Sequence, residues 1–168
     1  MSRGVLVAGI GNIFQTDDAF GVEVAMRLSR RALPSGVRVE DFGIRGVHLA
    51  YELLEGYHGL VLIDAVPMGE PAGTLAVIVP EVGSAPAPGD DVAPVVDAHT
   101  MNPDVVLATL TRLGGSVEQI FIVGCQPANL QEGMGLTTAV AAAVDDAVEM
   151  CCQLVSEIVE PVGKGSSS

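Results

Sequence analysis

The sequence has no tryptophan, and aromatic residues make up only 4% of its 168 residues, although 49% of the residues are hydrophobic. The core must therefore be built from Val, Leu, Ile and Ala, which is the composition of a buried parallel sheet. A chain of this length is expected to form one domain. We predict that this domain spans residues 1–162 and that the remaining residues, 163–168 (GKGSSS), form a disordered polar tail.

Basic residues are also scarce, because 8 Lys and Arg stand against 21 Asp and Glu, which gives a formal charge of −13. Such a field repels phosphate backbones and anionic lipid surfaces, so nucleic-acid binding is not expected. Cations and cationic peptide segments are the favoured partners. No apolar run approaches the roughly 20 residues that a transmembrane helix needs, and the run at 5–10 is too short for a signal peptide. These features predict a protein with no membrane insertion.

Cysteine is rare as well, and the three residues Cys125, Cys151 and Cys152 provide neither an even disulfide framework nor a CxxC pair. A thiolate metal site and a thioredoxin-like redox motif are therefore not expected. We interpret the cysteines as small buried hydrophobic residues, and this usage predicts a cytoplasmic location.

What the sequence does contain is a regular alternation of strand and helix patterns. Strands are expected at 5–9, 37–42, 60–65, 74–79 and 118–124, and helices at 19–31, 47–55, 103–113 and from 137 or 138 to about 159. The proline-rich segment 80–96 is expected to be a long surface loop. The alternation predicts an α/β fold, a single three-layer α/β/α domain with a mainly parallel twisted sheet. In such folds ligands bind at the carboxyl ends of the strands.

Several catalytic and binding motifs are missing. The first predicted strand ends in a glycine-rich turn, GIGN, but Phe14 stands where a dinucleotide-binding loop would have its third glycine. No GKS or GKT follows, and two carboxylates before the next helix would repel a phosphate. An organic cofactor is therefore not expected. There is no GxSxG motif for a nucleophilic serine, and Cys125 has no sequence cue for a paired base.

Two adjacent acids, Asp17 and Asp18, lie in the loop before the first predicted helix. Asp is a preferred helix N-cap and an acid in the first turn is favourable, so one of the two is expected to do only that. Two acids exceed what a cap requires. Because this loop lies at the end of the sheet where ligands bind, the other acid is a candidate site residue.

Asp64 and His99 complete the candidate site. Asp64 ends an apolar predicted strand, where a carboxylate is costly to desolvate unless it is paired, hydrogen-bonded or bound to a metal. The alternative is a cap or an ion-pair partner in the following loop. His99 lies in a loop before a predicted helix, and histidine is a common metal ligand. With Asp18, these residues would form a three-ligand set with an open position for a divalent metal such as Zn or Ni.

Together these segments resemble the hydrogenase maturation endopeptidases, which process the large subunits of [NiFe] hydrogenases. The resemblance covers essentially the whole chain, in the family's order. The segments that carry it are 9–13 (GIGNI), 16–21 (TDDAFG), 41–43 (DFG), 62–65 (LIDA), 97–99 (DAH), 123–127 (VGCQP) and 135–137 (GLT).

The resemblance implies an endopeptidase, classed with the aspartic-type peptidases, that recognises nickel already inserted into a large-subunit precursor and removes the precursor's C-terminal extension after a basic residue. It implies that Asp18, Asp64 and His99 are both the nickel-contacting and the catalytic residues, and that the substrate supplies the nickel. Gly11, Asn12 and Asp41 are candidate residues of the substrate loops. Asp41 begins the segment 41–43, where the family's DGG turn is here DFG. Some members of the family have Glu in place of Asp18.

Two other hypotheses remain open from the sequence. The same three ligands would serve a non-catalytic, chaperone-like module that binds metal and docks on a metalloenzyme precursor without cutting it. A hydrolase that acts on another substrate, such as a peptidyl-tRNA, is disfavoured by the charge of −13. We expect the endopeptidase to be a monomer. Whether nickel takes part in its chemistry or only marks a ready substrate stays open.

Overall fold

The computed structural model describes residues 4–80 and 103–159. The expected tail at 163–168, most of the expected loop at 80–96, and His99 lie outside these ranges. The elements follow in the order β1 (Val5–Ile10), the 3-10 turn η1 (Thr16–Ala19), α1 (Phe20–Leu28), β2 (Val37–Gly43), α2 (Gly46–Leu53), β3 (Gly59–Ala65), β4 (Leu75–Ile78), α3 (Pro103–Arg112), β5 (Gln119–Cys125) and α4 (Thr138–Val159). The strands and helices thus lie where the periodicity predicts them.

The strands form one sheet in the order β2-β1-β3-β5-β4. Strands β1, β2, β3 and β5 are parallel, whereas β4 runs antiparallel to β5 at the edge. The reason for this reversal is the short connection, residues 66–74, which leaves no room for the helical crossover that a parallel strand needs. The prediction of a mainly parallel sheet is confirmed.

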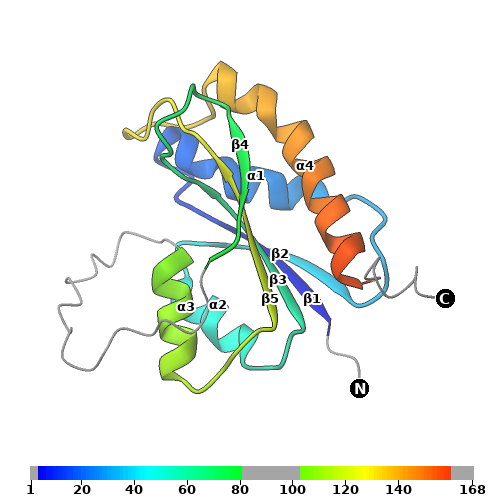
Figure 1. Cartoon of the computed structure of the whole chain (residues 1–168). Helices are drawn as coiled ribbons and strands as arrows, with labels where there is room; N and C mark the ends of the chain where they lie inside the picture. The colour runs from blue at the N-terminus through cyan, green and yellow to red at the C-terminus, as the bar shows by residue number, and fades with distance from the viewer. Residues whose placement is uncertain (1–3, 81–102, 160–168) are drawn as a thin grey trace.

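The helices cover both faces of the sheet. Helices α1 and α4 lie on one face and α2 and α3 on the other, as Figure 1 shows. Along β1, Val5 and Val7 belong to the first core, whereas Leu6 and Ala8 belong to the second. Because β1 and β3 are buried on both faces, they read as continuous apolar runs in the sequence. The three-layer prediction is confirmed. No helix in the two described ranges is long and apolar enough to cross a membrane.

Two glycines allow the start of α1 to pack directly against the backbone of the sheet. A Cβ atom at Gly21 would overlap the carbonyl oxygens of Ile10 and Ile63, and one at Gly9 would overlap the carbonyl oxygen of Gly21. The backbone of α1 therefore contacts the backbone of β1 and β3, which no larger residue would allow. This contact places the turn η1, with both of its acids, over the carboxyl ends of the two central strands.

Candidate active site

Asp64 is the sixth residue of β3 and lies at the carboxyl edge of the sheet. Its side chain is buried, with the residue only 4% exposed, and among the described residues its Oδ1 atom has no hydrogen-bond partner. Burial raises the pKa of Asp64 well above its usual range, the negative charge of Asp18 raises it further, and the N–H of Ala65 opposes both. A buried carboxyl oxygen without a partner is the kind of group that either holds a proton or meets a cation.

Asp18 faces this group from η1. Its Oδ2 atom accepts a hydrogen bond of 2.7 Å from the backbone N–H of Asn12, and burial raises its pKa against the effect of that bond. The loop closes this tightly because Gly11 has a φ of +137° and no Cβ, which would otherwise overlap the carbonyl oxygen of Asp18. Asp18 thus lies close enough to Asp64 for its charge to raise the pKa of Asp64, and Gly11 and Asn12 lie beside Asp18.

Asp41 lies on the neighbouring strand. It is an exposed residue of β2 that pairs with Gly9 of β1, and its backbone carbonyl accepts a hydrogen bond from Arg45. Two residues later, the carbonyl oxygen of Gly43 accepts the N–H of Gly11 at 2.9 Å. Asp41 thus shares the carboxyl edge with the two site acids, but it lies on the outer side of β1.

Asp17 has a different role from its neighbour. It is fully buried, and its carboxylate accepts hydrogen bonds from the backbone N–H groups of Ala128, Asn129 and Thr137 at 2.7–3.0 Å, and from the hydroxyl of Thr137. Burial alone would raise the pKa of Asp17, but the hydrogen bonds from Thr137, Ala128 and Asn129 outweigh it and the pKa is lowered. Asp17 therefore fixes the β5–α4 loop against η1.

This finding corrects the N-cap expectation. The N-cap residues of η1 and α1 are Gln15 and Ala19, and neither helix has a side-chain cap. Asp17 instead binds donors that are 111 to 120 residues further along the chain. The expectation that one of the two acids has only a structural role agrees with these contacts, but the structure that it supports is a distant loop.

Gln126 is a site-edge residue that sequence reasoning missed. Its Oε1 atom accepts the backbone N–H groups of Met68 and Glu70, so it orders the loop that follows Asp64. The signal was available, because Gln126 directly follows the buried strand β5 at the edge where Asp64 lies. The same reasoning that selected Asp64 would have selected it.

The third predicted ligand, His99, lies outside the described residues, and within them no group of three or more His, Cys, Asp or Glu could hold a metal ion. The two other histidines do not join the acids. His48 is exposed on α2, and the Nδ1 atom of His58 lies 2.6 Å from Glu118 near the amino ends of β3 and β5. Cys125 is also a poor nucleophile, since burial and the charge of Asp17 raise its pKa to about 11.

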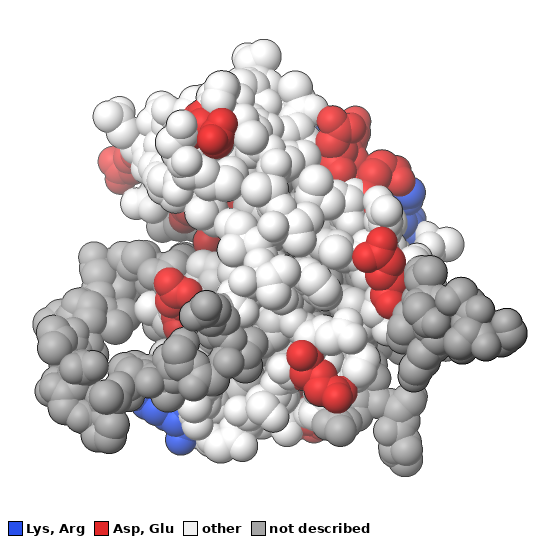
Figure 2. Space-filling model, in the orientation of Figure 1, with Lys and Arg blue, Asp and Glu red and all other residues white. Residues whose placement is uncertain are grey.

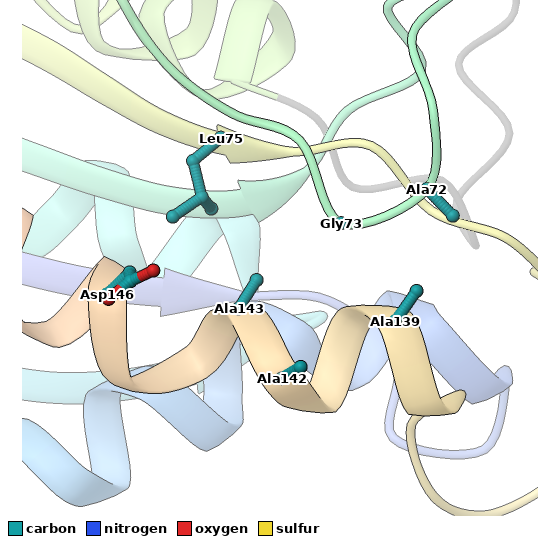
Figure 3. A pocket seen from close by; sticks show the side chains of 7 residues that line it. All are labelled: Ala72, Gly73, Leu75, Ala139, Ala142, Ala143 and Asp146. Carbon is teal, nitrogen blue, oxygen red and sulfur yellow. The ribbon is translucent and has the colours of Figure 1, made fainter.

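A pocket of about 350 Å³ lies between the segment leading into β4 and the first turns of α4 (Figure 3). Small and apolar side chains form most of its lining, which consists of Ala72, Gly73, Leu75, Ala139, Ala142, Ala143 and Asp146. The pocket includes neither Asp18 nor Asp64. With a single ionisable residue in its lining, it does not offer the paired carboxyl groups found at the strand ends.

Comparison with known proteins bears directly on this geometry. A family model described as hydrogenase maturation protease matches residues 22–154. The chain belongs to the hydrogenase maturation protease family. The resemblance inferred from the sequence is therefore confirmed, and the matched range includes Asp64 and His99 and begins four residues after Asp18.

Individual relatives are similar to this chain over two thirds or more of their own length. The hydrogenase 2 maturation protease of Escherichia coli K12 is 30% identical over 160 residues, which cover 91% of each chain. The hydrogenase expression/formation protein HupD of Rhodobacter capsulatus is 34% identical over 151 residues, covering 86% of this chain and 67% of the relative. Among solved structures, the hydrogenase maturating endopeptidase HybD from E. coli gives a TM-score of 0.74 at 28% identity and covers 92% of this chain and 93% of its own.

Proposed function

We propose that this chain is the endopeptidase that removes the C-terminal extension of a nickel-loaded [NiFe] hydrogenase large-subunit precursor. Family membership supports the class of reaction. The observation that carries the assignment to a site is the pair Asp18 and Asp64, in which the charge of one carboxyl group raises the pKa of the other and Asp64 Oδ1 lacks a partner among the described residues. Such coupled acids are characteristic of catalytic sites.

The acid pair suits peptide hydrolysis of the aspartic type. Both carboxyl groups have raised pKa values, and Asp64, which is more deeply buried, holds its proton more readily. Two like groups that cannot both ionise divide the roles of acid and base. In this proposal ionised Asp18 accepts the proton of the attacking water, and protonated Asp64 donates its proton to the leaving amine.

The same residues fit recognition of the substrate's nickel. A partnerless carboxyl oxygen beside a second carboxyl group is an oxygen-donor set that accepts a divalent cation, and an imidazole such as that of His99 would complete it. Nickel here is part of the substrate, so the proposal requires no resident metal.

The test uses the precursor from the same organism, purified with nickel and, in parallel, without it. Mass spectrometry of the intact precursor before and after incubation should show loss of a C-terminal peptide from the nickel-loaded form alone. Asp18→Asn and Asp64→Asn should slow this loss by at least about 100-fold, as expected for general acid and base groups. Asp145→Asn, which alters an exposed acid on α4, is the matched control and should process at the wild-type rate.

The outcomes separate the alternatives. A precursor that binds but keeps its mass would favour the non-catalytic metal-binding module. Processing of nickel-free precursor at the same rate would exclude the proposal that the chain recognises nickel. The proposal that it is a peptidase would stand. Normal processing by Asp18→Asn would exclude the acid-pair assignment.

The net charge of −13 offers a further contribution, since a precursor tail with basic residues would be attracted to it. On the face drawn in Figure 2 the acidic side chains lie in several separate places rather than in one patch. On this face, steering would therefore come from several separate acids rather than from one acidic patch. It should weaken as the salt concentration rises, and a processing rate independent of ionic strength would count against it.

A further inference from the structure

Exposed apolar side chains gather around the candidate active site. Of the twelve large hydrophobic residues that are exposed in the described ranges, six lie in the segments that follow the carboxyl ends of β1, β2 and β5. We call these six residues the apolar rim: Ile13, Phe14, Ile44, Val47, Leu130 and Met134. Phe14 is 58% and Met134 is 72% exposed. A concentration of exposed apolar groups on an otherwise well-packed domain marks an interaction surface.

Backbone hydrogen bonds hold the three segments of the rim together. The N–H of Gly133 donates to the carbonyl of Phe14, and the N–H of Thr16 donates to the carbonyl of Gly133, both at 2.9 Å. The N–H of Gly11 joins the β1 segment to Gly43 in the same way. Figure 1 shows the η1 segment and the loop before α4 side by side at this end of the sheet. The rim is therefore built from segments far apart in sequence but fixed in space.

Backbone strain at the junction is a second, independent feature. Thr16 has a φ of +49°, a left-handed conformation that is unfavourable for a β-branched residue. Its N–H bond to Gly133 and a 2.6 Å bond from its hydroxyl to the carbonyl of Gln131 hold it in that conformation. Strain of this kind is maintained where a loop must keep one shape for a function.

The rim is also continuous with the acid pair. The side-chain oxygen of Asn12 accepts the N–H of Phe14, while the backbone N–H of Asn12 donates to Asp18. The three rim segments, 11–15, 43–47 and 129–136, contain one acidic and one basic residue, Glu132 and Arg45. The rim thus has no net charge of its own on a chain of net charge −13, so charges within the rim do not oppose contact with an apolar partner surface.

We infer that the apolar rim is the docking surface for the folded body of the large-subunit precursor, which it holds while the tail enters the acid pair. This inference rests on the proposed function, because that function requires a protein substrate at Asp18 and Asp64. A second copy of this chain on the rim would cover the acids and block them. A rim that is rigid before binding loses little entropy on contact, which favours a stable complex.

The test replaces two rim residues by a polar one, Phe14→Ser together with Met134→Ser. The matched control is Met26→Ser with Leu113→Ser, two exposed residues outside the rim (46% and 40%). The kinetics of processing nickel-loaded precursor give KM and kcat, and equilibrium binding is measured in an Asp18→Asn background that prevents turnover. We expect the rim variant to raise KM and Kd at least about tenfold, because buried apolar anchors dominate interfaces, with kcat within about twofold. The control should stay within twofold of wild type.

All four substituted side chains are exposed, and equal melting temperatures will show that the fold is intact. If the variant with Phe14→Ser and Met134→Ser fails to fold, a second variant with Ile44→Ser and Leu130→Ser tests the same surface. A rim variant with wild-type KM and Kd, or with a reduced kcat at unchanged KM, overturns the inference. So does sedimentation that shows a wild-type dimer and a monomeric rim variant with unaltered precursor binding. Failure of the proposed function would look different, because the wild-type chain would then leave the mass of the precursor unchanged whatever the binding data show.

Discussion

Replacing Asp17 by alanine should destabilise the folded protein far more than replacing its neighbour Asp18. Asp17 is fully buried and accepts hydrogen bonds from three backbone N–H groups of the β5–α4 loop, and from a hydroxyl. Within the described residues Asp18 accepts one hydrogen bond, from the backbone N–H of Asn12, and its charge raises the pKa of Asp64. The two adjacent acids therefore differ in what they contribute to stability.

The loss of unfolding free energy in Asp17→Ala follows from the backbone N–H donors that are left without an acceptor. A buried N–H group that loses its partner costs about 1–3 kcal/mol, and Asp17→Ala leaves three of them. Water entering the vacated space will satisfy part of this demand, so the three costs do not simply add. We expect a loss of about 3–5 kcal/mol from a total that is typically 5–15 kcal/mol. Asp18→Ala should change stability by less than about 1 kcal/mol, because relief of repulsion offsets the lost bond.

Urea unfolding followed by circular dichroism measures both values, provided the slope m is unchanged. The control is Asp145→Ala, which removes an exposed ion pair with Arg27 that is worth little. The contribution of Asp17 also has a defined pH dependence. Because its pKa is lowered on folding, its stabilising effect is present above the ordinary value of about 4 and is lost as the pH falls through the lower folded value. Equal losses for Asp17→Ala and Asp18→Ala, or a loss below about 1 kcal/mol for Asp17→Ala, would refute this reasoning.

Three further predictions follow from the burial of individual groups. Asp64→Asn should abolish processing yet raise the melting temperature of the free protein by roughly 2–4 °C at pH 7. Since folding raises the pKa of Asp64, wild-type stability falls as the pH rises above about 4, and the gap between the two proteins in a thermal melt should close on acidification; a gap that widens would contradict this. Gly21→Ala forces a Cβ into the carbonyl oxygen of Ile63 and should cost more than about 2 kcal/mol in urea unfolding, so an unchanged midpoint would exclude the close backbone contact. Burial raises the pKa of Cys125 to about 11 and that of Cys151 to about 12, so a thiol reagent at pH 8 should label these two rapidly only after denaturation; fast labelling of both in the native protein would show that they are accessible.

Those parts of the fold that depend on local pattern were predictable from the sequence. The apolar runs of β1 and β3 and the glycine that follows α2 mark element ends to within about a residue or two. Asp64 could be selected because a carboxylate at the end of a buried run is conspicuous. The direction of β4 was not specified, since an edge strand with the pattern Leu75–Ile78 reads alike in either direction.

Contacts between distant segments could not be read from the pattern. The donors to Asp17 lie 111 to 120 residues away, and nothing in the local sequence distinguishes Asp17 from Asp18. The apolar rim was hidden for the same reason, because the segments that contain Phe14 and Met134 are brought together only through the pairing of Gln15 with Gly133. The candidate acids of the site could thus be predicted from residue types. The contacts between distant segments that hold the site in place could be seen only in the fold.

The close backbone contact between α1 and the sheet has a consequence for which residues of this protein can change during evolution. At Gly9 and Gly21 the contact is made by main-chain atoms, and main-chain atoms are the same whichever side chains surround them. The valines, leucines and alanines of the two cores can therefore be exchanged for others of similar volume without displacing the turn that holds Asp18 relative to Asp64. The core residues can therefore change during evolution while the spacing of the two acids stays fixed. Gly9 and Gly21, in contrast, cannot be replaced by a residue with a Cβ atom without disturbing this contact.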